Sequence, residues 1–135
     1  MVIVQIMGSW CPNCLDETRY LADLHNKYQK DGLEVVALAF ERTKSEEKAF
    51  ENVGELKERT GANYPFLLAS WERKANAAEK LPMLNHIMSF PTAIYLNRKG
   101  EVVKIHTGFY GPGTGEMYEK FSRETEAFVS ALLEE

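Results

Sequence analysis

Two apolar segments and the amphipathic segment between them limit this chain to few folds. Residues 2–7 and 33–40 are mostly apolar and contain β-branched residues, as expected of strands covered on both faces. Between them, Leu21, Leu24 and Tyr28 recur at helical spacing, and an Asp-Gly pair follows that suits a left-handed helix end. A strand, a helix and a strand in this order predict a βαβ unit with parallel strands.

A second helix and a third strand are predicted next. Thr43-Lys44-Ser45-Glu46 has the pattern of a capping box and predicts a helix that ends at Gly61. Residues 64–69 predict a short strand, and a proline near its beginning favours the edge of a sheet. Residues 72–80 are rich in alanine and predict a short helix, whereas residues 83–89 fit a loop or a helix.

The last third of the chain predicts a hairpin and a final helix. Residues 92–96 and 101–106 read as two strands joined by a turn with Gly100 at its last position. Thr114 is expected to cap the final helix. The apolar residues of that helix recur at helical spacing: Met117, Phe121, Phe128 and Leu132.

One domain, residues 1–135, accounts for the whole sequence. The element order predicts an α/β domain with a central mixed β-sheet flanked by helices. The net charge of −4 gives no electrostatic argument for nucleic acid or anionic lipid, and no apolar run has the length of a membrane span. Because the sequence starts directly on a core strand, we expect that an N-terminal hairpin or a targeting segment is missing from it.

Both cysteines lie in Trp10-Cys11-Pro12-Asn13-Cys14, between the first strand and the first helix. Unpaired amide groups and the positive end of the helix dipole favour a thiolate at this place. Pro12 suits the first helical position, so Cys11 is expected to face solvent while Cys14 turns inward. A disulfide here closes a very small ring and adds about 2 kcal/mol at most before strain. We therefore interpret the pair as a redox couple, with no other cofactor.

This combination resembles the thioredoxin fold and, more narrowly, the TlpA/ResA group of thiol–disulfide oxidoreductases. An extra β-α insertion between the βαβ and ββα halves is similar to the insertion that separates this group from plain thioredoxin. The resemblance covers nearly the whole chain. The residues that carry it are Trp10, Cys11, Pro12, Cys14, Glu17 and the runs 90–96 (FPTAIYL) and 97–103 (NRKGEVV).

The resemblance implies a role for individual residues. Cys11 corresponds to the attacking thiol and Cys14 to the resolving thiol, and Glu17 matches an acidic residue that helps move protons. Pro91 matches the family's cis-proline, which leaves the preceding backbone available to an extended client segment. The residues expected to bind that segment are Trp10, Pro12, Phe90, Pro91 and Thr92.

Two positions depart from the pattern of the family. Gln5 stands where thioredoxin has a buried carboxylate, and an amide cannot accept the proton, so this task passes to Glu17 or water. Arg19 stands where the fold often has a proline that kinks the helix, which predicts a straighter first helix.

Plainer interpretations of the same residues stay open. The cysteines could be half of a zinc site, but no second C-x-x-C is present and the histidines lack ligand spacing. Glu17 could be a solvated acid favoured by the helix dipole, and Trp10 an ordinary core aromatic. His25 and His106 are more typical of structural positions, and the charges from Arg42 to Arg59 of a solvated helix face.

Three functions compete. The leading hypothesis is an enzyme that exchanges its dithiol with protein disulfides, acting as a reductant in redox homeostasis. A thiol peroxidase of the peroxiredoxin kind shares the fold, but Gly8 stands where that chemistry needs a threonine. The third is an interaction module without catalysis.

The expected partners are client proteins with disulfides or thiols and an upstream thiol donor, with no nucleic acid and no membrane insertion by this segment. We expect a monomer. The family resemblance implies an extracytoplasmic location, in the periplasm or cell envelope.

Overall fold

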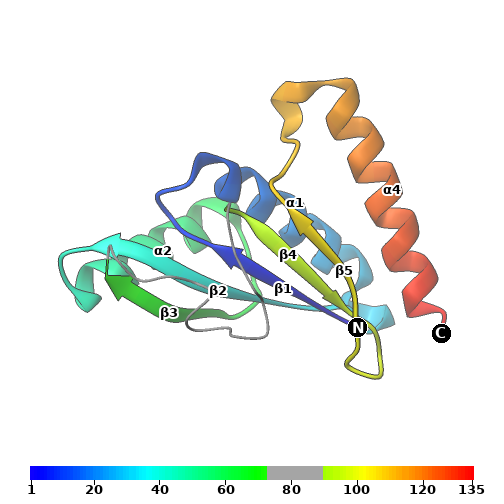
Figure 1. Cartoon of the computed structure of the whole chain (residues 1–135), viewed down its shortest axis with the longest axis horizontal. Helices are drawn as coiled ribbons and strands as arrows, with labels where there is room; N and C mark the ends of the chain where they lie inside the picture. Colours follow the sequence, from blue (N-terminus) through cyan, green and yellow to red (C-terminus); the bar gives the residue numbers. More distant parts are fainter. Residues whose placement is uncertain (73–89) are drawn as a thin grey trace.

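The computed structural model describes residues 1–72 and 90–135, which form a five-stranded sheet with helices packed on it (Figure 1). The strands run in the order β3-β2-β1-β4-β5. Their bounds are β1 Val2–Met7, β2 Glu34–Thr43, β3 Phe66–Glu72, β4 Thr92–Leu96 and β5 Val102–Thr107. The helices are α1 Pro12–Tyr28, α2 Glu46–Thr60 and α4 Glu116–Leu133, with short 3-10 turns at Gln29–Asp31 and Pro112–Thr114.

The sheet is mixed, as predicted. β1 pairs in parallel with β2, from Val2 opposite Glu34 to Met7 opposite Ala39, and β2 pairs in parallel with β3. β4 is antiparallel to both β1 and β5. The carboxyl end of β1 therefore lies beside the amino end of β4, and this pairing brings the Cys11 loop close to Phe90.

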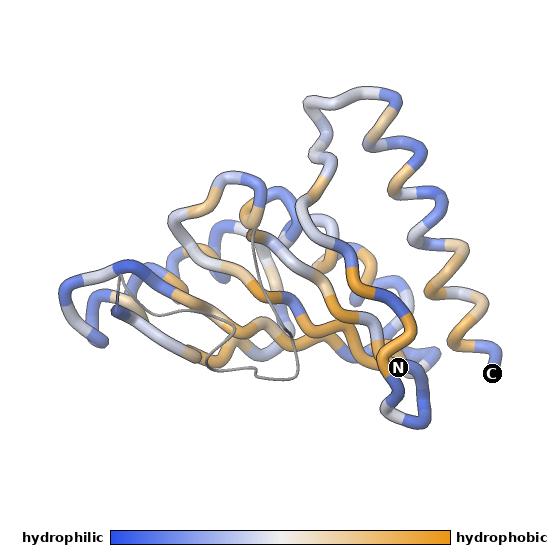
Figure 2. The backbone as a smooth tube through the Cα atoms, in the orientation of Figure 1, coloured by the Kyte–Doolittle hydropathy of each residue, from blue (hydrophilic) through white to orange (hydrophobic). Residues whose placement is uncertain are grey.

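The larger hydrophobic core lies between one face of the sheet and all three helices. Ile3 and Met7 of β1 join buried side chains of α1, α2 and α4, such as Leu21, Leu56 and Val129. A smaller cluster of Ile6, Phe40 and Ile94 occupies the opposite face. Figure 2 shows the hydrophobic colour concentrated along the central strands and alternating with hydrophilic colour along α4.

The prediction of β3 at a sheet edge is confirmed, although the strand starts after Pro65 and is longer than expected. The predicted capping box at Thr43 is wrong. Thr43 stays in β2 opposite Glu72, and Ser45 caps α2 by accepting a hydrogen bond from the Lys48 N–H. Gly61 ends that helix with a φ of 70°, as its sequence position predicts.

Two predictions about the final helix also need correction. Thr114 does not cap α4, because its hydroxyl donates to the Gly111 carbonyl within a 3-10 turn and Gly115 takes the cap position. Met117 is exposed, whereas Leu132 is buried and Phe128 packs against the core. The first turn of α4 thus extends beyond the core that its C-terminal half covers.

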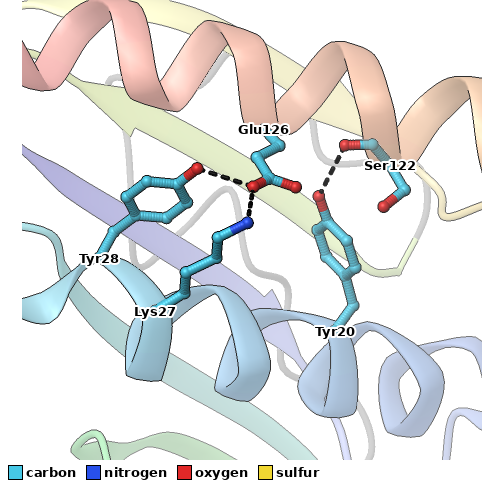
Figure 3. A network of polar contacts seen from close by, with 5 residues as sticks. All are labelled: Tyr20, Lys27, Tyr28, Ser122 and Glu126. Carbon is cyan, nitrogen blue, oxygen red and sulfur yellow. Dashed lines mark hydrogen bonds and ion pairs between the residues drawn. The ribbon is translucent and has the colours of Figure 1, made fainter.

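Polar contacts hold α4 against α1 (Figure 3). The hydroxyl of Tyr28 donates to the Glu126 carboxylate over 2.7 Å, and Lys27 forms an ion pair with the same carboxylate. The hydroxyl of Tyr20 reaches the Ser122 carbonyl at 3.3 Å. These contacts fix the helix that carries the cysteines from the side opposite α2.

The helix predicted at 72–80 lies outside the described residues except for Glu72, which belongs to β3 and not to a helix, and the predicted loop or helix at 83–89 lies entirely outside them. Among the helices that the structure does describe, none has the length and apolar character needed to cross a membrane.

Candidate functional site

Cys11 lies at the junction where β1 has ended and α1 begins. Its backbone N–H donates to the Gly8 carbonyl at 3.2 Å, which closes the loop, and Pro12 occupies the first helical position. The Cys11 sulfur takes the place of a capping side chain and accepts a hydrogen bond from the Cys14 N–H at 3.3 Å. A sulfur that caps a helix is surrounded by donors that stabilise its thiolate.

Hydrogen bonding lowers the pKa of Cys11 to about 7. The largest contribution comes from the Cys14 side chain, and the backbone N–H groups of Cys14 and Asn13 add to it. Burial opposes this shift, and the positive charge of Arg42 supports it slightly. Near neutral pH a large fraction of Cys11 is therefore thiolate, the form that attacks disulfides.

Cys14 has the opposite character. Its side chain is 0% exposed, on the face of α1 that packs against the sheet. Burial raises the pKa of Cys14 far above its ordinary value, and the neighbouring Cys11 adds to that rise. Both cysteines are free thiols. The prediction that Cys14 turns inward is confirmed.

The prediction that Cys11 faces solvent is wrong for this reduced form, since its side chain is only 6% exposed. The Phe90–Pro91 segment lies against it, and the Cys11 thiol is 3.7 Å from the Phe90 carbonyl oxygen. The Phe90–Pro91 peptide bond is cis, as the family resemblance implies. Access to the sulfur is therefore along the edge of this segment.

Glu17 is buried, which contradicts the interpretation as a solvated acid. Its side chain is 2% exposed, and Oε1 has no hydrogen-bond partner among the described residues. Burial raises the pKa of Glu17 to about 8; the nearby Gln5 amide opposes this, and Cys11 adds slightly to it. A carboxyl group with this pKa, on the same helix face as Cys14, is suited to exchanging a proton at neutral pH.

Gln5 takes part in a buried chain of hydrogen bonds. Its amide donates to the Thr18 hydroxyl at 3.0 Å, and its carbonyl oxygen accepts from the Tyr64 hydroxyl at 3.0 Å. Thr18 in turn donates to the Cys14 carbonyl oxygen at 2.7 Å. The amide at position 5 therefore connects β1 to the helix turn of Cys14, without providing a proton acceptor. Arg19, the second departure from the family pattern, is exposed on α1.

Two residues at the carboxyl end of β2 support the cysteine loop, and sequence reasoning missed both. Glu41 is 2% exposed, and its two carboxylate oxygens accept hydrogen bonds from the Ser9 N–H, at 2.7 Å, and from the Ser9 hydroxyl. The guanidinium carbon of Arg42 lies 3.5 Å from the Trp10 ring centroid. The charged residues of α2 are mostly exposed, as the interpretation of a solvated helix face predicts, and Arg42 is exposed too, but it lies on β2 and not on that helix. Both Glu41 and Arg42 follow directly on the apolar run 33–40. Because β1 and β2 are parallel, both strands end on the same side of the sheet, and from this position in the sequence Glu41 and Arg42 could have been predicted to lie near the cysteine loop.

Trp10 is held on several sides and is not an ordinary core aromatic, because 36% of it is exposed. Its indole N–H donates to the Phe40 carbonyl at 2.9 Å, and the Phe90 ring meets it edge-on with centroids 5.2 Å apart. A Cβ at Gly8 would lie 2.2 Å from the indole nitrogen, so only glycine leaves room for this ring. Trp10 forms part of the wall of a cavity of about 410 Å³ beside Cys11.

The other predicted client-binding residues differ in their access to solvent. Pro12 is exposed and lines the same cavity, and Phe90 is partly buried. Pro91 and Thr92 are buried, and Thr92 pairs with Ile6 and with Thr107 inside the sheet. The structure thus brings Trp10, Pro12 and Phe90 to the surface around Cys11 and leaves Pro91 and Thr92 beneath it.

Among residues 1–72 and 90–135, no group of three histidine, cysteine or acidic side chains is placed to hold a metal ion. His25 is buried with its Nδ1 2.9 Å from the Asn63 side-chain oxygen, as expected of a structural histidine. His106 packs against Phe121 with ring centroids 4.9 Å apart.

Comparisons with known proteins agree with this geometry. The chain is 30% identical over 107 residues to the thiol-disulfide oxidoreductase ResA of Geobacillus thermodenitrificans, covering 79% of this chain and 54% of that protein. It spans about half the length of the curated relatives that it matches first.

Solved structures show the same fold. A thiol:disulfide interchange protein of the thioredoxin family from Chlorobium tepidum aligns with a TM-score of 0.64 at 20% identity, covering 90% of this chain and 78% of that one. A secreted disulfide oxidoreductase of Mycobacterium tuberculosis aligns with a TM-score of 0.63 at 12% identity, covering 93% and 80%. The fold is thus thioredoxin-like, and the sequence profile of the Redoxin family matches residues 1–120. This chain belongs to the Redoxin family.

Proposed function

We propose that this protein is a thiol–disulfide oxidoreductase that reduces disulfides of client proteins with the Cys11/Cys14 pair. The observation that carries the proposal is the contrast between the two thiols. Cys11 has a pKa lowered to about 7 at a helix start, while Cys14 lies buried one turn further on. The similarity to ResA supports the same activity.

The reaction takes two exchange steps. The Cys11 thiolate attacks one sulfur of the client disulfide, so that a mixed disulfide forms and the client's other sulfur leaves as a thiolate. Cys14 then loses its proton and attacks the Cys11 sulfur, which releases the client's second thiolate. Both client thiolates take up protons, and the two electrons gained by the client come from the Cys11/Cys14 dithiol.

In this proposal Glu17 accepts the proton of Cys14. Burial raises the pKa of Glu17 to about 8, so an accessible fraction is ionised near neutral pH. Its position three residues after Cys14 places both side chains on one helix face. Gln5 cannot take this role, because an amide is not a base near neutral pH, and its two ends instead bond Thr18 and Tyr64.

The site is less suited to the alternatives. A peroxidase needs a side chain at position 8, and a Cβ there would lie 2.2 Å from the Trp10 indole. An interaction module without catalysis has no need of a thiol with a lowered pKa. We further propose an extracytoplasmic location, which the family resemblance and the secreted structural neighbour support.

Reduction of insulin in the presence of dithiothreitol tests the function. We expect the wild type to accelerate the reaction and Cys11→Ser to abolish that acceleration. Activity that survives Cys11→Ser would overturn the proposal. Cys14→Ser tests the second step, because a client bound to Cys11 can no longer be released and should accumulate as a mixed disulfide.

A further inference from the structure

A cation without an ion-pair partner among the described residues lies at the edge of the cysteine loop. The guanidinium carbon of Arg42 is 3.5 Å from the Trp10 ring centroid, the separation of a stacked pair. Stacking uses the flat face of the guanidinium and leaves the N–H groups at its rim available. Within residues 1–72 and 90–135, no carboxylate forms an ion pair with Arg42.

Trp10 connects this cation to the reactive sulfur. The indole precedes Cys11 in the chain and is fixed by its hydrogen bond to the Phe40 carbonyl. On its edge it meets the Phe90 ring, and the Phe90 carbonyl faces the Cys11 thiol. A client segment that lies along Phe90 to reach Cys11 therefore passes over Trp10 toward Arg42.

The cavity beside Trp10 has room for a side chain, and Arg42 lies at its wall. Its volume of about 410 Å³ accommodates a residue of any size, and Leu15 and Leu56 contribute apolar lining. Among the described residues, four charged side chains line it, two of each sign: Glu41, Arg42, Glu55 and Arg59. Both oxygens of the buried Glu41 accept hydrogen bonds from Ser9, and Glu55 precedes Arg59 by one turn on α2. Arg42 has no ion-pair partner among the described residues, so it can bind a negatively charged occupant.

We propose, on the basis of the function proposed above, that this cavity is a subsite for an acidic side chain of the client, close in sequence to the cysteine under attack, and that Arg42 determines this preference. A planar guanidinium binds a carboxylate through two parallel N–H···O bonds, and Trp10 orders it beforehand. The occupant is a glutamate or aspartate of a client polypeptide.

The test uses peptides with one disulfide that differ only in the residue near the reacting cysteine. Glutamate, glutamine or lysine is placed one, two or three positions before or after that cysteine, and kcat/KM for reduction is measured at low ionic strength. We expect glutamate to be preferred over glutamine by about fivefold at one or more positions, and lysine to be the poorest substrate. The preference should shrink in 0.5 M salt, because the pair is open to solvent.

Arg42→Gln should reduce the glutamate-to-glutamine ratio to about one, mainly through KM for the glutamate peptide. This ratio separates binding from reactivity, since the charge of Arg42 also lowers the pKa of Cys11 slightly and any loss of thiolate slows both peptides equally. Arg42→Lys keeps the charge without the planar fork and should restore the ratio in part. Arg123→Gln, on the exposed side of α4, changes the net charge equally and should leave the ratio unchanged.

The outcomes separate the two proposals. Equal reduction of all three peptides by the wild type, or a glutamate preference that persists in Arg42→Gln, would overturn the subsite and leave the oxidoreductase in place. Failure of the wild type to reduce any peptide or insulin would instead overturn the function itself.

Discussion

Cys11 and Cys14 lie one turn apart on the same helix, yet their surroundings shift their pKa values in opposite directions. Cys11 caps the helix, and hydrogen bonds lower its pKa to about 7. Cys14 is enclosed by the core, and burial raises its pKa. The comparison shows that the position of each cysteine in a C-x-x-C pair sets its role. The thiol at the helix start is partly ionised and can attack, whereas the buried thiol stays protonated until a mixed disulfide has formed and a base accepts its proton.

The largest expected effect is a difference in alkylation between the two thiols. In the reduced wild type at pH 7.5, iodoacetamide should modify Cys11 at least about a hundredfold faster than Cys14, because thiolate fraction and access both favour Cys11. Tandem mass spectrometry of the amino-terminal peptide distinguishes the two sites. Comparable labelling of both thiols in the folded protein would contradict the difference in pKa and access between Cys11 and Cys14.

The next effect concerns stability and tests whether the surroundings of Cys14 also raise the pKa of Glu17, which lies on the same helix face. The folded pKa of Glu17 is about 8, above its ordinary value of 4.5, so the folded state keeps a proton that the unfolded chain releases. The free energy of unfolding should therefore fall as pH rises from 4.5 to 8. Glu17→Gln removes this loss, and at pH 8 the reduced variant should exceed the wild type by about 4 kcal/mol in urea unfolding. A difference between the two proteins that stays constant from pH 5 to pH 8 would contradict the buried acid.

The smallest effect concerns the rate at which Cys14 resolves a mixed disulfide. Glu17→Gln should slow the decay of a Cys11–client mixed disulfide about tenfold, because Cys14 loses its nearby proton acceptor. Stopped-flow measurements between pH 6 and 9 should show a rate that levels off near pH 8 in the wild type, whereas the slower rate of the variant should keep rising with pH. Asp16→Asn removes a carboxylate one position away and serves as the control. An equal slowing by both variants would attribute the effect to net charge.

Periodicity predicted most of the fold. Residues 2–7 and 33–40 are mostly apolar runs on either side of an amphipathic helix, and this pattern admits little besides parallel strands. The start of α2 was harder to predict, since Thr43 and Ser45 are both residues that often cap helices. Thr43 is still paired with Glu72 in the sheet, so the helix is capped by Ser45. The sequence pattern does not show how far the pairing of β2 with β3 extends.

The site was predicted in its motif and incompletely in its surroundings. Helical spacing already places Glu17 between Cys14 and Leu21 on one face, so its burial was accessible from the sequence. The contact of Glu41 with Ser9 was not, because it joins two strand ends 32 residues apart. The low exposure of Cys11 likewise depends on Phe90, which lies 79 residues further along the chain.

The antiparallel pairing of β1 with β4 makes the chemistry of Cys11 a reporter of the folded state. Any opening that parts Ile6 from Thr92 withdraws the Phe90 segment from the sulfur, and fraying of the first turn of α1 removes the amide donors that cap it. In either kind of local opening the pKa of Cys11 returns toward that of an ordinary thiol. The rate at which Cys11 reacts with a slow alkylating reagent therefore reports how often this part of the structure opens.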